Sequence, residues 1–410
     1  MKKLAFGIAV LLAVAGCDSE GFMGYDIAPS YDKGESDGYA EGEEPGGSQG
    51  AIQGKPGVIT AGEWNDLDNW DLWSRLMNST SDEQGEEQTD EQRTCYGDTA
   101  PYWRFWTNRR VALKVVSGDN APLPGVKVVL SDGNTKIWEA VTDVLGRADC
   151  WVGLHNFEYQ SGKLSISLNG VRMEGEPAVT GWSEEPVQMN TYTISADAPE
   201  PKADILFIVD ATGSMSDELE FLKADLEDIL KKGRELNTSI TFRTGALFYR
   251  DKGDTYLTRV SGFTTDLNKT SNFIKKQFAA EGGDFPEAVH TALEESLQKF
   301  DWNASARARI AFILLDAPPH QDHQGVLESI HKSIDRYAAM GIKLIPIASS
   351  GIDKPTEFFL RMVAMVTEGT YVFITDDSGV GNEHLEPTVG EYKVELLNDL
   401  MVRLLHKYLE

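Results

Sequence analysis

Three short segments of the sequence carry oxygen-bearing side chains that could bind a metal ion. In Asp210-Ala211-Thr212-Gly213-Ser214, a carboxylate and two hydroxyls alternate along one tight turn. Asp284 lies in the Gly-rich segment 282–287, and Asp316 directly follows an apolar run. Carboxylate and hydroxyl oxygens are ligands for Mg²⁺ first, and also for Mn²⁺ or Ca²⁺. No set of Cys and His residues accompanies them, which argues against structural zinc. The sequence therefore predicts a divalent cation site at the turn that holds Asp210, Thr212 and Ser214.

The elements that must position these residues begin at Lys202. From there, apolar runs of strand length alternate with amphipathic stretches of helix length, which predicts an α/β fold with a doubly wound, mostly parallel sheet. Ligands of such sheets bind at the carboxyl ends of the strands, and Asp210 and Asp316 directly follow predicted strands. The expected strands and helices are Ile205–Val209, Leu219–Leu236, Ile240–Phe248, Phe285–Phe300, Ile310–Leu315, Val326–Met340, Ile342–Ala348, Phe358–Val366, Tyr371–Ile374 and Tyr392–Leu409.

The three metal-binding segments resemble the metal-ion-dependent adhesion site of the von Willebrand factor type A family. The resemblance covers residues 202–410 and implies that family's Rossmann-like fold. Asp210, Thr212 and Ser214 match the family's Asp-x-Ser-x-Ser, with Thr in place of the first Ser, and Asp316 matches the Asp after the fourth core strand. Asp284 stands where many members have Thr, so three carboxylates would surround one ion. Alternatively, Asp284 caps a helix that begins near Phe285 and does not reach the ion.

Other polar residues follow the same predicted strands. Tyr249, Arg250 and Asp251 come after the second strand, and His320 lies four residues beyond Asp316. We expect them on the rim of the metal site, at the same edge of the sheet. A polar hairpin turn is the preferred interpretation of residues 249–251, and framing a ligand is the alternative. His320 and His323 could bind a second metal, but a solvated loop is the preferred interpretation of that segment.

Residues 101–198 have a different pattern. Short alternating runs such as 111–116, 126–130 and 164–168 are separated by turn signals, which predicts a small antiparallel β-sandwich. The run that begins at Pro124-Gly125, together with Thr142-Asp143, resembles the carboxypeptidase-regulatory-like module. That resemblance implies a spacer or a binding module without catalysis.

The N-terminus has the pattern of an export signal. Lys2 and Lys3 precede about thirteen apolar or small residues, too few to span a bilayer. The sequence Val14-Ala15-Gly16-Cys17 resembles a bacterial lipobox, which implies that residues 1–16 are a signal peptide and that lipidated Cys17 anchors the chain to the cell envelope. The acidic residues after Cys17 resemble surface export signals in some bacteria and inner-membrane retention signals in others; we favour the outer membrane or the cell surface.

Residues 17–100 are expected to form an acidic, flexible tether, because Gly, Ser, Asp and Glu dominate them. Trp64, Trp70 and Trp73 interrupt this composition. We expect them to dock on the domain that follows, with a partner-binding motif as the alternative. Once Cys17 is lipidated, Cys95 and Cys150 remain, and an oxidising compartment would favour a disulfide between them.

Composition limits the functions. With 65 acidic residues against 38 basic ones, the chain has a net charge of −27, which argues against nucleic acid as a partner. We expect a binding protein rather than an enzyme, with a protein or glycan as its ligand, held through the metal ion. The first alternative is a metal-dependent hydrolase, which would need His320 or His323 as its general base. The second is an envelope assembly factor.

Overall fold

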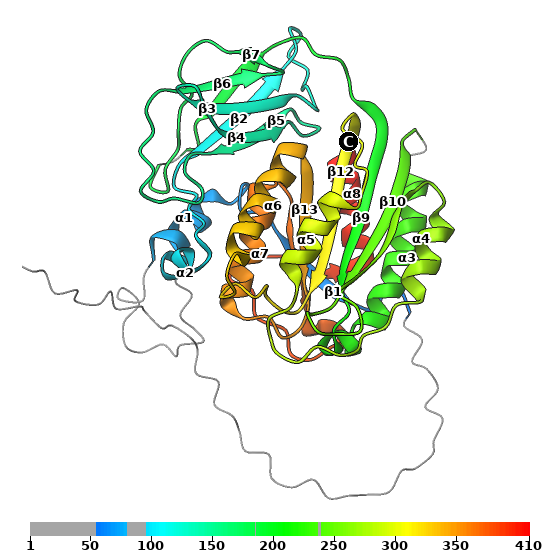
Figure 1. The fold of residues 1–410 in the computed structure, drawn as a ribbon. Coiled ribbons are helices and arrows are strands. Elements are labelled where there is room, and N and C mark those ends of the chain that lie inside the picture. The colour runs from blue at the N-terminus through cyan, green and yellow to red at the C-terminus, as the bar shows by residue number, and fades with distance from the viewer. Residues whose placement is uncertain (1–54, 80–95, 185, 237–238) are drawn as a thin grey trace, which may run out of the picture. The chain divides into compact units, whose positions relative to one another are not determined.

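The structure is a computed structural model that describes residues 55–79, 96–184, 186–236 and 239–410 (Figure 1). The predicted signal peptide, Cys17, Cys95 and much of the predicted tether lie outside the described residues. In the described part, one strand and two helices come first, small β-sheets follow over residues 110–193, and the elements of an α/β domain begin at residue 200.

A mostly parallel sheet forms the centre of the α/β domain. Within the described residues it has eight strands in the order β11-β10-β9-β12-β13-β14-β1-β15. Strands β10, β9, β12, β13 and β14 run parallel, whereas β11 and β1 pair antiparallel with their neighbours. The bounds are β9 Glu200–Asp210, β10 Thr241–Tyr249, β11 Thr258–Thr264, β12 Ala306–Leu315, β13 Ile342–Ala348, β14 Tyr371–Thr375, β1 Thr60–Trp64 and β15 Glu395–Leu396.

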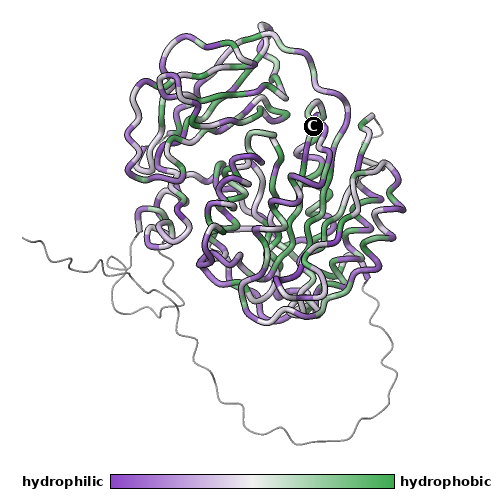
Figure 2. The backbone as a smooth tube through the Cα atoms, in the orientation of Figure 1, coloured by the Kyte–Doolittle hydropathy of each residue, from purple (hydrophilic) through white to green (hydrophobic). Residues whose placement is uncertain are grey.

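Helices cover both faces of this sheet. Along β9, Ile205, Phe207 and Val209 face one hydrophobic cluster with α3, α4 and α8, while Leu206 and Ile208 face another with α5, α6 and α7. Hydrophobic residues accordingly concentrate along the central strands in Figure 2. The predicted α/β fold class with a mainly parallel sheet is confirmed. The helices are α3 Leu219–Leu236, α4 Leu267–Lys275, α5 Val289–Gln298, α6 Val326–Met340, α7 Lys354–Val366 and α8 Leu397–Leu409, with short 3-10 helices η2 Gly213–Asp217 and η3 Asp376–Ser378.

The strands before β9 form two small sheets with the orders β5-β2-β8 and β4-β3-β6-β7. Their pairing is antiparallel except between β2 and β8, which run parallel. We call this region the sandwich. Its strands are β2 Arg110–Val116, β3 Lys127–Asp132, β4 Thr135–Val141, β5 Arg147–Trp151, β6 Leu164–Leu168, β7 Val171–Arg172 and β8 Met189–Thr193.

Part of the segment predicted as flexible tether is ordered. Residues 60–64 are strand β1, which pairs with β14 of the α/β sheet. Helices α1 (Trp70–Asn78) and α2 (Tyr96–Trp103) flank the undescribed residues 80–95. Trp73 is buried, stacks 5.8 Å from the Phe358 ring, and donates from its indole nitrogen to the Thr107 hydroxyl at 2.8 Å. The sequence composition hid this strand because its five residues include a Gly and a Glu within an acidic, Gly-rich stretch.

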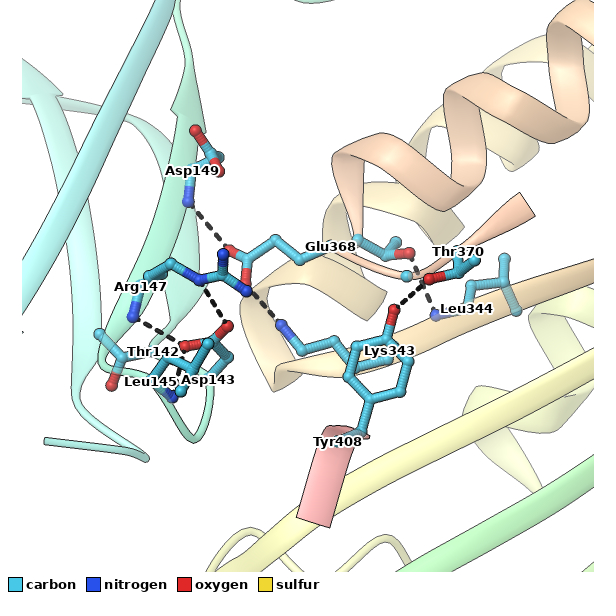
Figure 3. Close-up of polar contacts among 12 residues, drawn as sticks. Thr142, Asp143, Leu145, Arg147, Asp149, Lys343, Leu344, Glu368, Thr370 and Tyr408 are labelled. Atoms are coloured by element: carbon cyan, nitrogen blue, oxygen red, sulfur yellow. Dashed lines mark hydrogen bonds and ion pairs between the residues drawn. The ribbon is translucent and has the colours of Figure 1, made fainter. Parts of the chain in front are cut away.

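Buried charges join the N-terminal segment and the sandwich to the α/β domain. Arg361 of α7 donates to both carboxylate oxygens of Asp66, at 2.6 and 3.0 Å. Glu368 accepts from the backbone N–H of Asp149 at 2.9 Å and forms an ion pair with Lys343 (Figure 3). We call this contact the seam, and its charged members are Asp66, Asp149, Lys343, Arg361 and Glu368. None of the helices in the described residues is both long and apolar enough to cross a bilayer.

Candidate metal centre

Three neighbouring parallel strands bring polar residues to one edge of the α/β sheet. Asp210 is the last residue of β9, Tyr249 is the last residue of β10, and Asp316 directly follows β12. Tyr249 lies opposite Asp210 in the pairing of the two strands. Since the carboxyl ends of parallel strands share an edge, side chains that are distant in sequence meet there.

The turn after β9 gathers its side chains as the alternating pattern predicts. The Thr212 hydroxyl donates to Asp210 Oδ1 at 2.7 Å, and the Thr212 backbone N–H donates to the same oxygen at 2.8 Å. The Ser214 hydroxyl lies 3.2 Å from that of Thr212. One carboxylate and two hydroxyls therefore meet within hydrogen-bond distances.

Two carboxylates at this edge are buried and incompletely paired. Asp210 and Asp316 are 0 % and 5 % exposed, and Asp210 Oδ2 and Asp316 Oδ1 have no hydrogen-bond partner within the described residues. Burial raises the pKa of both carboxyls. Nearby acids act in the same direction: the charge of Asp251 raises the pKa of Asp210, and the charge of Asp210 raises the pKa of Asp316. The Ser214 hydroxyl acts in the opposite direction on the pKa of Asp316. Buried carboxylates left in this condition are costly unless a proton or a cation neutralises them.

Glu287 is a further member of this group that the sequence analysis did not assign. It is 3 % exposed, and its Oε2 has no hydrogen-bond partner in the described part of the chain. Burial, followed by the charges of Asp210, Asp251 and Asp316, raises its pKa to about 9. A carboxylate three residues after Asp284, at the entrance to a predicted helix, is the signal that could have identified it.

Gly282 allows Glu287 to approach the turn after β9. Its φ is +76°, and a Cβ atom there would lie 3.0 Å from Glu287 Oε1 and 3.1 Å from Thr212 Cβ. Gly213 likewise faces the backbone oxygen of Glu281, which would lie 2.7 Å from an added Cβ. These glycines let the segment 281–287 lie directly against the metal-binding turn. We call Asp210, Thr212, Ser214, Glu287 and Asp316 the edge site.

Asp284, which was predicted to join Asp210 and Asp316, belongs to a group of possible metal ligands that the sequence analysis did not predict. It is exposed, and its carboxylate instead groups with Asp251 and His320, whose ligand atoms all lie within 4.8 Å of one another. It does not cap the next helix, since α5 begins at Val289 with Ala288 as its N-cap residue. Near Gly282 the chain brings Glu287 against Thr212 of the turn after β9, since a Cβ atom at Gly282 would lie 3.0 Å from Glu287 Oε1 and 3.1 Å from Thr212 Cβ.

The four predicted rim residues are all buried, and their role in framing a ligand stays a prediction. The Tyr249 hydroxyl faces Asp210 without the geometry of a hydrogen bond. Arg250 donates to the backbone oxygens of Ala211 and Phe278, both at 3.0 Å, and pairs with Glu281. Tyr249 and Arg250 therefore support the edge site from beneath.

Asp251 and His320 lie together beside the edge site. His320 Nε2 is 2.9 Å from Asp251 Oδ1, and the two residues are 6 % and 7 % exposed. The His320 ring stacks on that of His323, with 4.6 Å between the ring centroids. His320 is therefore part of a packed cluster rather than of a solvated loop, although His323 is exposed.

The predicted disulfide remains a prediction. Cys150 lies on β5, is buried and forms no disulfide within the described residues, and burial raises the pKa of its thiol. Its predicted partner Cys95 lies outside the described residues.

The fold agrees with the sequence comparison. Residues 204–344 match the model of the von Willebrand factor A domain family, so this part of the chain is a von Willebrand factor A domain. A curated ariadne-like RING finger protein of Acanthamoeba polyphaga mimivirus is 33 % identical over 117 residues, which are 28 % of this chain and 11 % of that protein. The chain thus spans about a tenth of that relative's length.

One solved structure matches part of this chain, with low overall similarity. BatB, a conserved hypothetical protein from Bacteroides thetaiotaomicron, is 12 % identical, with a TM-score of 0.35 over 50 % of this chain and 98 % of that chain.

The residues of the edge site fit a divalent cation. They offer carboxylate and hydroxyl oxygens, which are the ligands that Mg²⁺ and Mn²⁺ accept, and three of the carboxylates carry buried oxygens without a hydrogen-bond partner in the described chain. A bound cation would neutralise charge at a place where burial makes it costly.

Proposed function

We propose that the von Willebrand factor A domain binds a divalent cation, Mg²⁺ first, at the edge site and uses it to hold a protein or glycan ligand. The observation that carries this proposal is the set of three buried, mutually repelling carboxylates, Asp210, Glu287 and Asp316, each with one unpaired oxygen in the described chain. Domains of this family commonly bind divalent cations. In this proposal the ion supplies an attachment point for an oxygen atom of the ligand, and the protein is not an enzyme.

The charge of the edge site favours neutral ligand oxygens. If Asp210, Glu287 and Asp316 are all ionised around one divalent ion, the local charge is about −1, which weakens the attraction for a carboxylate ligand. The net charge of −27 acts in the same direction. Hydroxyl and carbonyl oxygens, such as those of glycans and peptide backbones, are therefore the preferred donors in this proposal.

The rest of the chain would place the domain at the cell envelope. We propose that Cys17 carries the lipid anchor, in the outer membrane or at the cell surface, and that the acidic segment gives the binding domain reach. This part of the proposal rests on the sequence pattern of residues 1–54, which lie outside the described residues.

Capture from native envelope extract tests the proposal. The immobilised protein is incubated with extract either in about 5–10 mM Mg²⁺ or in chelator. That Mg²⁺ concentration is roughly an order of magnitude above a dissociation constant of about 1 mM. We expect capture only with Mg²⁺, at least about tenfold less with Asp316→Ala, and no change with Asp377→Asn, which removes an exposed charge outside the edge site. Protease or periodate treatment of the extract then separates a protein ligand from a glycan.

Equal capture in chelator, or by Asp316→Ala, would contradict metal-dependent binding. Loss of capture with Asp377→Asn as well would point to non-specific electrostatic attraction instead.

A further inference from the structure

Three separate segments meet next to the edge site. Asp251 lies in the connection after β10, Asp284 lies before α5, and His320 lies in the connection after β12. Their ligand atoms, two carboxylate oxygens and one imidazole nitrogen, all lie within 4.8 Å of one another. Three ligand atoms at that spacing can reach a single metal ion between them. We call these three residues the His group.

The His group combines buried and exposed ligands. Asp251 and His320 are buried and face each other at 2.9 Å between Oδ1 and Nε2, whereas Asp284 is exposed. An ion held here would therefore have two fixed ligands on its inner side and an approach from solvent on the outer side. That is the arrangement of a site that can load and release a metal ion.

Backbone contacts fix the three segments without using the three ligand side chains. Asp254 accepts from the backbone N–H of Asp251 at 3.1 Å and from that of Gly282 at 3.2 Å. The backbone N–H of Glu287 donates to the Pro318 oxygen at 2.8 Å. The ligand positions are therefore set by the surrounding chain, as a preorganised metal site requires.

A buried carboxylate next to the His group also lacks a partner. Glu287 is 3 % exposed, and its Oε2 has no hydrogen-bond partner in the described chain. Its backbone N–H donates to the oxygen of Pro318, two residues before His320, which places Glu287 beside the His320 segment. A buried carboxylate oxygen without a partner is costly unless a proton or a cation lies close to it.

We propose that Asp251, Asp284 and His320 form a second divalent cation site, distinct from the edge site and selective for a transition metal ion such as Zn²⁺. The imidazole ligand carries the selectivity, because imidazole suits Zn²⁺ and other transition ions, while Mg²⁺ prefers oxygen ligands alone. The two neighbouring sites would thus take different metals. This inference does not depend on the edge site binding an ion.

A second group shares His320 and competes with this assignment. His320, Asp322 and His323 also lie within 4.8 Å of one another, but Asp322 and His323 are both exposed. All three belong to one short segment, so fewer contacts fix their positions. The buried Asp251 beside His320 Nε2 favours the His group.

Zn²⁺ binding to the full-length protein in excess Mg²⁺ tests the proposal. Equilibrium dialysis with metal analysis gives the affinity of the tightest Zn²⁺ equivalent. We expect Asp251→Asn, Asp284→Asn and His320→Gln each to weaken it at least tenfold, and Asp322→Asn and His323→Gln to leave it within about twofold. Asp284 is exposed, so Asp284→Asn keeps the test valid if a buried variant unfolds.

The outcomes separate this proposal from the function proposed above. Asp316→Asn should abolish Mg²⁺ binding at the edge site while Zn²⁺ affinity persists. Unchanged Zn²⁺ affinity in Asp284→Asn and His320→Gln would overturn the second site. A loss with His323→Gln but not with Asp251→Asn or Asp284→Asn would also overturn it, because the ion would then belong to the competing group.

Discussion

At the seam, buried charged side chains face partners of opposite charge: Arg361 holds Asp66, and Lys343 holds Glu368. At the edge site, buried carboxylates face one another, and each keeps an oxygen without a hydrogen-bond partner in the described residues. Both regions are similarly buried, so burial alone does not distinguish them. The difference is whether the protein supplies the neutralising charge itself. The Arg361–Asp66 pair of the seam is neutralised within the protein, whereas the edge site is organised for a charge from outside.

The largest expected effect comes from breaking the seam. Replacing Arg361 with Met removes a fully buried guanidinium and leaves the Asp66 carboxylate without its bidentate partner. We expect Arg361→Met to lower the free energy of unfolding by about 3–5 kcal/mol, measured by urea unfolding.

Arg403 provides the matched control, because it pairs with Glu63 and Glu395 but its side chain is 45 % exposed. We expect Arg403→Met to cost at most about 1 kcal/mol. Equal losses of unfolding free energy in the two variants would show that the seam pair contributes no more to stability than an ordinary surface ion pair.

We also expect the free energy of unfolding to depend on pH through Glu368 of the seam. Burial raises the pKa of Glu368 from 4.5 to about 7, although Lys343 acts to lower it. Because the pKa is higher in the folded state, the contribution of this group to stability is present below about pH 4.5 and is lost as the pH rises through about 7.

Glu368→Gln removes this titration and leaves Lys343 without its partner carboxylate. We therefore expect the wild type to lose stability relative to the variant, by up to about 3 kcal/mol, between pH 4.5 and 7.5. Urea unfolding of both proteins across this range provides the measurement. A stability difference that does not change with pH would contradict the prediction.

At the edge site, removing a charge should have the opposite sign. In chelator at pH 8, Asp316→Asn removes a buried carboxylate that repels Asp210. We expect this variant to be about 1–2 kcal/mol more stable than the wild type, measured by thermal unfolding. Adding Mg²⁺ should raise the unfolding temperature of the wild type only. Destabilisation of Asp316→Asn in chelator would show that Asp316 is a structural acid.

The sequence predicted the parts of this account that depend on local pattern. The boundaries of α3, α6 and β13 agree with their predicted ranges, because each has a clear hydrophobic period and clear ends. The alternation of Asp210, Thr212 and Ser214 likewise predicted a cluster that a single turn can form.

What the sequence did not reveal depends on contacts between distant segments. Strand β1 lies next to β14, more than 300 residues away in the chain, and its own composition is that of a linker. Asp284 and Glu287 are three residues apart, yet Glu287 lies against the turn after β9 while Asp284 groups with Asp251 and His320. The β11–α4 segment was also not predicted, since its strand and helix are short and partly exposed.

The most direct test of the central claim is calorimetric titration with Mg²⁺ of the wild type, Asp316→Ala and Asp284→Thr. The account predicts one Mg²⁺ per chain for the wild type, at least tenfold weaker binding for Asp316→Ala, and nearly unchanged affinity for Asp284→Thr, because Asp284 lies outside the edge site. Equal losses in Asp316→Ala and Asp284→Thr, or undiminished binding by Asp316→Ala, would contradict the claim that Asp210, Glu287 and Asp316 hold the ion.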